Sequence, residues 1–435
     1  MERWIRGSIR GGRHLFLLSV ALLLAVGLVA AACGGDDADE EPAPAVTEAP
    51  APAAEPEPAA EEPMAEEPMA EEPMAEEPMA EEPMAEEPMA EEPMAEEPMA
   101  EEMMDEEPLR VAHLIIQASI DDEGYFLSHE EGVQAAAERL GNVETALIQF
   151  IPPNEEFTQT TQQVIDDGYN IIVDSGAAGA LFLDACAGVE GVACLETYGI
   201  PPFADNVVSY YPKHWHTAYL VGVAAGLLTE TGTIGYVVTF DIPLVVANVN
   251  AYLLGCQSVR EDCTLKNVTI NSWFDPPLET EAAHALVNDG VDVLFGFIDD
   301  ATALITASER GVWAATMFKD LRRHGEDAYI TSALMIWDEF YEAEFQAVRD
   351  GTWSGNRQVL FELGSGADID SFGPNVPADV VEQVMQVRAD IISGAFNPFV
   401  GPFYDQDGVE QVPAGEALSD EFLYSGWSWY VQGVE

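Results

Sequence analysis

The chain has 435 residues and a formal net charge of −63, with 79 Asp and Glu against 16 Lys and Arg. A field this negative repels nucleic acid and anionic lipid head groups, so polynucleotides are excluded as partners. The charge is uneven along the chain. Residues 1–33 carry four Arg and one acidic residue, residues 34–107 carry 29 acidic residues and no basic one, and residues 108–435 carry 12 basic and 49 acidic residues. We therefore consider the three segments separately.

Residues 1–33 have the pattern of an export signal. Four Arg precede an apolar run from Leu15 to Ala32, which ends in three alanines before Cys33. A basic start, an apolar run and small residues at the cleavage site are typical of a secretory signal. The Cys favours a lipoprotein signal, cleaved before Cys33, whose thiol then carries the lipid. An uncleaved N-terminal helix anchor is the alternative. Both interpretations place the protein outside the cytoplasm, on a membrane.

Residues 34–107 predict a tether without a core. Eight copies of EEPMA run without a break from Glu61 to Ala100. Pro at every fifth position removes a helix donor, and paired Glu side chains repel each other. So little apolar surface cannot offset the entropy lost on ordering, and we expect a disordered acidic segment that can extend over roughly 200 Å. Two interpretations of this segment remain open: a spacer through a cell wall, and a low-complexity expansion without function.

Residues 108–435 alternate strand-like and helix-like stretches. The apolar run Val111–Ile116 is followed by Tyr125–Leu140, where Phe126, Val133 and Ala137 fall on one helical face. Further strands are expected near 146–150, 170–174, 233–240, 265–270, 291–297, 312–318 and 329–332, and helices near 157–167, 216–230, 245–258, 279–289, 301–310 and 337–350. This alternation predicts parallel α/β sheets.

The segment 108–435 is longer than one core usually supports, so we expect two doubly wound lobes joined by a hinge. We place the boundary between the lobes near 227–233, with the chain crossing back near 337 and again near 360. Ligands of such sheets bind beyond the carboxyl ends of the strands, which predicts a site in the cleft between the lobes. Hinge motion can close such a cleft over a ligand.

Aromatic and acidic residues stand at the predicted strand ends. Asp122, Gly124 and Tyr125 follow the first strand, Trp273 follows another, and Asp299 and Asp320 follow two more. Aromatic faces stack on flat heterocycles, and carboxylates accept hydrogen bonds from ring N–H, amino or hydroxyl groups. A single Trp could equally pack in a core, and a single Asp could cap a helix. Their joint placement favours a binding site.

Neither the sequence motifs nor the spacing of the cysteines gives a strong indication of catalysis or metal binding. No nucleophile, metal or phosphate-binding signature occurs, so we expect neither an enzyme nor a cofactor or metal. Beyond Cys33, the cysteines form two close pairs, Cys186 with Cys194 and Cys256 with Cys263. Local disulfides are favoured in an oxidising compartment, with free buried thiols and a zinc site as alternatives.

Several strings occur in order through residues 108–435. They are Asp122-Glu123-Gly124-Tyr125 with His129, Thr231–Val237 followed by Ile242-Pro243, Asn271–Pro276, Gly351-Thr352-Trp353, and Phe399–Gly408. In these strings the chain resembles the basic membrane protein (BMP) family of lipoproteins, which are solute receptors of ABC importers, and within it the branch associated with purine bases. The resemblance implies a type I periplasmic-binding-protein fold, a purine base or nucleoside as ligand, and ABC permease and ATPase subunits as partners.

The resemblance also implies roles for individual residues. Tyr125 and Trp273 are expected to stack on the ligand. Asp122 and Asp320 are expected to accept its hydrogen bonds, with Asp299 as a further candidate. Gly124, in the first of the shared strings, is expected to contribute to the ligand-binding site, and Tyr211 and Trp337 are expected to line the cleft. A sensory receptor that signals to a membrane partner, a receptor for another small heterocycle or a sugar, and an enzyme acting on nucleosides are the alternatives.

Overall fold

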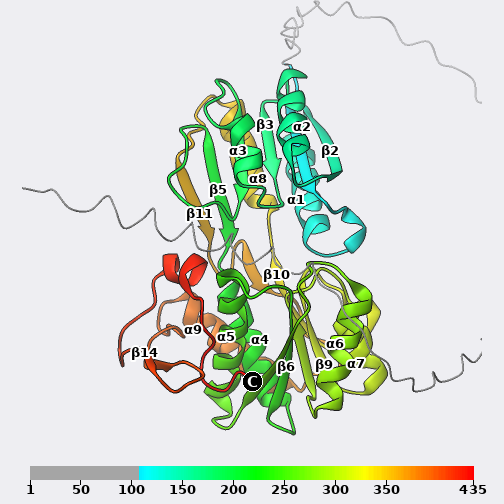
Figure 1. The fold of residues 1–435 in the computed structure, drawn as a ribbon, viewed down its shortest axis with the longest axis vertical. Helices are drawn as coiled ribbons and strands as arrows, with labels where there is room; N and C mark the ends of the chain where they lie inside the picture. The colour runs from blue at the N-terminus through cyan, green and yellow to red at the C-terminus, as the bar shows by residue number, and fades with distance from the viewer. Residues whose placement is uncertain (1–106) are drawn as a thin grey trace, which may run out of the picture. The chain divides into compact units, whose positions relative to one another are not determined.

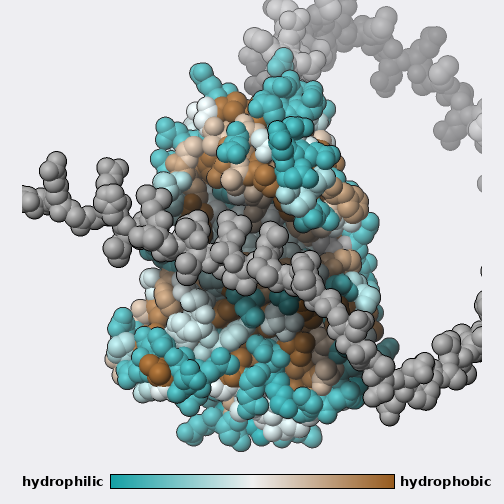
Figure 2. All heavy atoms as spheres, in the orientation of Figure 1, coloured by the Kyte–Doolittle hydropathy of each residue, from teal (hydrophilic) through white to brown (hydrophobic). Residues whose placement is uncertain are grey.

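The computed structural model describes residues 107–435, which fold into two α/β lobes, each built on a six-stranded sheet (Figure 1). The predicted signal, Cys33 and the repeat segment up to residue 106 lie outside the described residues. The α/β class with two mainly parallel sheets is therefore confirmed. The visible face of the described part is mostly hydrophilic, in line with its excess of acidic residues (Figure 2).

The first lobe contains a wholly parallel sheet with the strand order β11-β5-β4-β3-β1-β2. Its strands are β1 (Leu109–Ile116), β2 (Val143–Ile151), β3 (Ile171–Asp174), β4 (Ala193–Thr197), β5 (Val207–Pro212) and β11 (Arg357–Phe361). Its helices are α1 (Tyr125–Leu140), α2 (Glu155–Asp166), α3 (Ala180–Cys186) and α8 (Asp338–Arg349). β3, β4 and β5 are buried along their whole length, as parallel strands covered by helices on both faces are.

The second lobe has the strand order β12-β10-β9-β8-β6-β7, with only β12 antiparallel to its neighbour. The strands are β6 (Thr233–Val238), β7 (Thr264–Thr269), β8 (Val293–Gly296), β9 (Trp313–Phe318), β10 (Tyr329–Met335) and β12 (Ala367–Ile369). The helices are α4 (His214–Leu228), α5 (Pro243–Val259), α6 (Pro276–Asn288), α7 (Thr302–Arg310) and α9 (Ala378–Ile392). A short hairpin, β13 (Phe403–Tyr404) with β14 (Glu410–Val412), follows.

The chain passes between the lobes three times. It enters the second lobe between β5 and α4, returns between β10 and α8, and leaves the first lobe again between β11 and β12. The first passage lies well before the expected 227–233, because α4 belongs to the second lobe and packs against α5 and β10. Glycine permits this packing: a Cβ on Gly222 would lie 2.0 Å from the carbonyl oxygen of Tyr252.

Both local disulfides are formed. Cys186 at the end of α3 is bonded to Cys194 in β4, and Cys256 in α5 is bonded to Cys263 just before β7. Each bond therefore ties a helix to the strand that follows it, within one lobe. The pairing by proximity in sequence is confirmed, and the zinc and free-thiol alternatives for these four residues are excluded.

Candidate functional site

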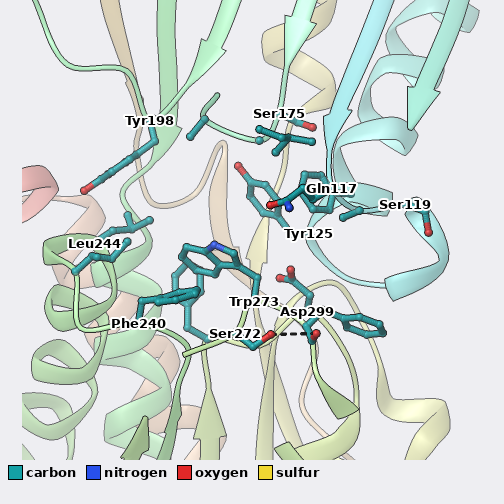
Figure 3. Close-up of a pocket in the computed structure, with 18 of the residues that line it drawn as sticks. Gln117, Ser119, Tyr125, Ser175, Tyr198, Phe240, Leu244, Ser272, Trp273 and Asp299 are labelled. Atoms are coloured by element: carbon teal, nitrogen blue, oxygen red, sulfur yellow. Dashed lines mark hydrogen bonds between the residues drawn. The ribbon is translucent and has the colours of Figure 1, made fainter. Parts of the chain in front are cut away.

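A cavity of about 790 Å³ lies between the two lobes, at the carboxyl ends of strands from both sheets (Figure 3). The first lobe contributes Ile116, Gln117, Ala118, Ser119, Asp121, Tyr125, Phe126, Phe150, Ser175, Gly176, Ala177, Tyr198 and Tyr211. The second lobe contributes Phe240, Ile242, Leu244, Asn271, Ser272, Trp273, Phe274, Phe297 and Asp299. The lining holds two carboxylates and many aromatic rings but no Lys, Arg or His, so it offers nothing to neutralise an anion.

The backbone at the cavity wall turns sharply. Five non-glycine residues of the lining have a positive φ: Gln117 at 54°, Phe150 at 58°, Ala177 at 53°, Tyr198 at 55° and Asn271 at 56°. Each lies at or just after the carboxyl end of a strand. Left-handed backbone at a residue with a Cβ costs on the order of 1 kcal/mol, and such residues gather at ligand sites because the surrounding structure must hold them there.

Tyr125, the first residue of α1, projects into the cavity from the first lobe (Figure 3). Its ring packs edge to face against His129 and Phe318, at centroid distances of 4.6 and 5.4 Å. Burial raises the pKa of Tyr125 above its ordinary value, so the phenol stays neutral. The ring is thus held rigidly, as a stacking surface requires.

Trp337 does not line the cavity, contrary to expectation. Its side chain is 1 % exposed, and its indole stacks on His129 at 3.7 Å while Nε1 donates to Ser128 Oγ. The ring also meets Tyr125 edge to face at 6.0 Å. Trp337 therefore supports Tyr125 from behind. The sequence could not show whether Trp337 lines the cavity or packs in the core behind it, because a Trp at the end of a strand suits either place.

Trp273 lies across the cavity from Tyr125, in the loop between β7 and α6 (Figure 3). It is 41 % exposed, and its ring centroid lies 4.9 Å from that of Phe240 and 6.3 Å from that of Phe297. Ser272 Oγ donates to the carbonyl of Phe274, which fixes the loop around the indole. A large, half-exposed indole beside other rings has a free face for a flat ligand.

Asp299 and Gly124 meet between the lobes. Asp299 follows β8, is 5 % exposed and lines the cavity. A Cβ added to Gly124 would lie 2.1 Å from the carbonyl oxygen of Asp299, so only glycine permits this approach. Tyr211, at the end of β5, also lines the cavity, and burial raises its pKa well above the ordinary value. Gly124 therefore contributes close contact between the lobes rather than a ligand-binding group.

The other two predicted hydrogen-bond acceptors are Asp320 and Asp122. Asp320 is exposed and outside the cavity, where its carboxylate accepts from Arg322 Nε at 2.8 Å. A guanidinium two residues away in the next turn thus holds it in its own lobe, which corrects the expectation that it binds ligand. Asp122 ends a short turn, Ile120–Asp122, and its side chain lies outside the described part of the structure.

Sequence reasoning missed much of the lining. Phe240 and Phe297 were included in predicted strands, yet both lie just beyond the end of the strand and point into the cavity. Gln117, Ser119 and Tyr198 also line it. The sequence contains a possible signal, since polar or aromatic residues follow the apolar part of each strand. The direction in which their side chains point depends on the positive φ values, which no sequence pattern predicts.

A buried hydrogen-bonded network stands behind the first lobe's wall. His113 Nδ1 lies 2.7 Å from Glu130 Oε2, and His113 Nε2 lies 2.9 Å from Ser175 Oγ. Ser175 also lines the cavity, although its side chain is buried. The neighbouring amides of Gly176 and Ala177 donate to side chains of Asp174 and Thr197. These hydrogen bonds hold the loop that follows β3 in place at the cavity wall.

The fold and this cavity can be compared with known proteins. Residues 109–395 match the family model Bmp, described as "ABC transporter substrate-binding protein PnrA-like". This chain belongs to the Bmp family. It is a substrate-binding protein of ABC transporters, and its small-molecule ligand and its permease and ATPase partners follow from that class.

Three relatives illustrate the family. The chain is 30 % identical over 319 residues to a purine-binding protein of Brucella abortus, covering 72 % of this chain and 89 % of that one. It is 30 % identical over 330 residues to a putative ABC transporter glucose-binding protein of Haloferax volcanii, covering 73 % and 78 %. A solute-binding protein structure from Aeropyrum pernix has a TM-score of 0.57 at 21 % identity, covering 68 % of this chain and 94 % of its own, which supports the fold.

Two kinds of feature are absent from residues 107–435. No helix in this part of the chain is both long and apolar enough to cross a membrane. Nor does this part bring three or more His, Cys, Asp or Glu side chains together in a way that could hold a metal ion.

Proposed function

We propose that this Bmp-family protein captures a purine base or nucleoside outside the cytoplasm and delivers it to an ABC importer. The observation that carries the proposal is the composition of the cavity. Tyr125 and Trp273 offer aromatic faces from opposite lobes, and the Asp121 and Asp299 carboxylates accept hydrogen bonds. A flat heterocycle with N–H, amino or ribose hydroxyl donors fits this set of groups.

The charges of the cavity argue for a ligand without phosphate. Phosphate recognition requires Arg, Lys or a set of free backbone amides, and the lining has no basic side chain. An amino acid would bring a carboxylate beside Asp121 and Asp299 with no cation to balance it. Neutral and cationic ligands are compatible with this lining. A nucleoside is neutral, and its base can contact both aromatic faces.

A sugar is the second candidate, since the Haloferax volcanii relative is named as glucose-binding and is as similar as the purine-binding one. Aromatic faces also pack on the apolar faces of sugars, and carboxylates accept from their hydroxyl groups. The presence of aromatic surfaces on both sides of the cavity favours a ligand that is flat on both faces, which a purine is and a hexose is not.

The route to the cell surface is part of the same proposal. We propose that the segment up to Cys33 is removed as a signal, that Cys33 carries a lipid, and that the acidic EEPMA repeats tether the two lobes to the outer face of the membrane. The support is the sequence pattern and the family, whose role places the ligand-binding lobes on the side of the membrane from which solute is taken up.

A thermal-shift screen of residues 107–435 tests the ligand. The panel holds adenine, guanine, hypoxanthine, xanthine, their nucleosides, glucose and several amino acids. A ligand that binds only the folded state raises the unfolding free energy by about 2.7 kcal/mol at a hundred times its Kd. We expect one purine class to raise the melting temperature and nucleoside monophosphates to leave it unchanged. A shift with glucose and with no purine would overturn the purine assignment and retain the binding fold.

A further inference from the structure

The two lobes are strongly charged with the same sign. The first lobe, residues 107–212 and 337–361, has 22 Asp and Glu against four Arg, a net charge of −18. The second lobe, residues 213–336 and 362–435, has 28 Asp and Glu against eight Lys and Arg, a net charge of −20. Like charges repel, so electrostatics opposes closing one lobe on the other, and some feature must offset that repulsion at the cleft.

Positive charge is concentrated in one short segment of the second lobe. Residues 319–324, which follow β9, contain Lys319, Arg322, Arg323 and His324, and hence three of the 12 Lys and Arg of the described residues. Arg322 stays within its own lobe, where it pairs with Asp320 and Asp370. The other three side chains reach the first lobe.

Lys319 and Arg323 form ion pairs between the lobes, and His324 adds a hydrogen-bond contact between them. Arg323 Nη2 donates to Glu123 Oε2 at 2.5 Å, and His324 Nε2 lies 3.0 Å from the same oxygen. Lys319 Nζ pairs with Glu131 on α1. The hydrogen bond with His324 and the charge of Arg323 hold the pKa of Glu123 below its usual range. The carboxylate is therefore ionised wherever the protein is folded at neutral pH.

The position of these pairs matches a closing role. Glu123 immediately precedes Gly124, whose backbone closely approaches that of Asp299 in the second lobe. The turn that carries it lies beside the α6 and α7 end of the second lobe, away from β5 and β11, beside which two of the three crossings run (Figure 1). Contacts at such a place are made when the lobes close and are lost when they open about the crossings.

We propose that Lys319, Arg323 and His324 form a basic clasp that holds the two acidic lobes closed, with Glu123 and Glu131 as its acceptors. The proposal rests on the proposed function only in that the lobes close over a ligand. A single exposed ion pair contributes little, but these pairs act on one open–closed equilibrium. The apparent affinity of a ligand that binds the closed state scales with the closed fraction.

The test uses the full chain with Cys33→Ser, so that spin labels attach only at introduced cysteines. Labels at Gln163→Cys on α2 and Glu281→Cys on α6, both exposed and on different lobes, report the distance between lobes without ligand. Inosine is the affinity probe. We expect Arg323→Glu to shift the distances to longer values and to weaken inosine binding about three- to tenfold. Reversing the pair, with Glu123→Arg added, should restore both to within about twofold.

Arg310→Glu is the matched control, because it changes the charge of the second lobe by the same amount. Arg310 bonds only His284 and Asn288 within its own lobe. We expect it to leave the distances unchanged. The clasp is overturned if Arg310→Glu opens the lobes as much as Arg323→Glu, or if neither variant does. If inosine does not bind at all, the purine proposal fails, while the label distances still decide the clasp.

Discussion

The two walls of the cavity differ in how they are built. Seven of the 13 residues in the first lobe's wall are polar or small and five are aromatic, and four of them have a positive φ. The second lobe's wall has nine residues, of which four are aromatic, with Trp273 half exposed beside Phe240 and Phe297. The comparison indicates that left-handed backbone is concentrated in the first wall, while the second wall presents the indole of Trp273 to the cavity.

The two walls also depend on each other at one point. Gly124 of the first lobe approaches the Asp299 backbone of the second so closely that no side chain fits between them. We expect this contact to limit how far the walls come together, along with the ion pairs at Glu123 and Glu131. Breaking it should separate the walls without altering either one.

Gly124→Ala should have the largest effect on binding. The added methyl would lie 2.1 Å from the Asp299 carbonyl oxygen, so the lobes must stay apart or one backbone must shift. We expect the ligand found in the thermal screen to bind at least a hundredfold more weakly, about 3 kcal/mol, by isothermal titration calorimetry. The melting temperature without ligand should change little, because each lobe keeps its core. A loss of less than threefold would show that full closure is not needed.

Trp273→Ala should weaken binding by at least tenfold, since stacking of a base on an aromatic ring contributes about 1–3 kcal/mol. Trp337→Ala is the matched control: a Trp of the same size, but buried behind Tyr125. It should lower the free energy of unfolding by about 3–5 kcal/mol, whereas Trp273→Ala should barely change it. Urea titration and calorimetry on both variants make the comparison. Unchanged affinity in Trp273→Ala would remove this residue from the site.

The smallest expected effect is a change in the pH dependence of stability, and it involves a buried glutamate behind the first lobe's wall of the cavity. Glu196 in β4 is buried, and burial, followed by the nearby charge of Asp174, raises its pKa to about 7. The folded protein therefore retains a proton that the unfolded chain releases above about pH 4.5, so stability is lost as pH rises from about 4.5 to 7. Glu196→Gln removes this loss.

The unfolding free energy of Glu196→Gln, relative to the natural protein, should rise by about 2 kcal/mol between pH 5 and pH 8. Urea denaturation at several pH values measures it. A constant difference across this range would mean that Glu196 is ionised in the folded state.

The sequence predicted the class of fold because parallel strands and amphipathic helices leave regular patterns. It failed where those patterns are weak. β5 carries two tyrosines and a proline and was not among the expected strands, and β11 and β12 are only five and three residues long. The lobe boundary was misplaced because α4 is apolar on every face, so its sequence does not indicate which sheet it covers.

The site was predictable only in part for a different reason. Strand ends marked Tyr125, Trp273 and Asp299 as neighbours, and all three line the cavity. Asp320 and Trp337 also follow strands, but a local Arg holds the first and the core encloses the second. Sequence order gives the end of the sheet at which a residue lies, and only local partners decide where its side chain points.

The three passages between the lobes have a consequence for how the chain folds. Neither lobe is a continuous piece, because β11 pairs with β5 only after residues 213–356 have been made and β12 joins its sheet later still. Until then β5 has an unpaired edge, which is open to pairing with another chain. A nascent molecule therefore cannot complete its first lobe before most of its second has emerged, and any factor that protects the β5 edge during that interval would govern the yield of folded protein.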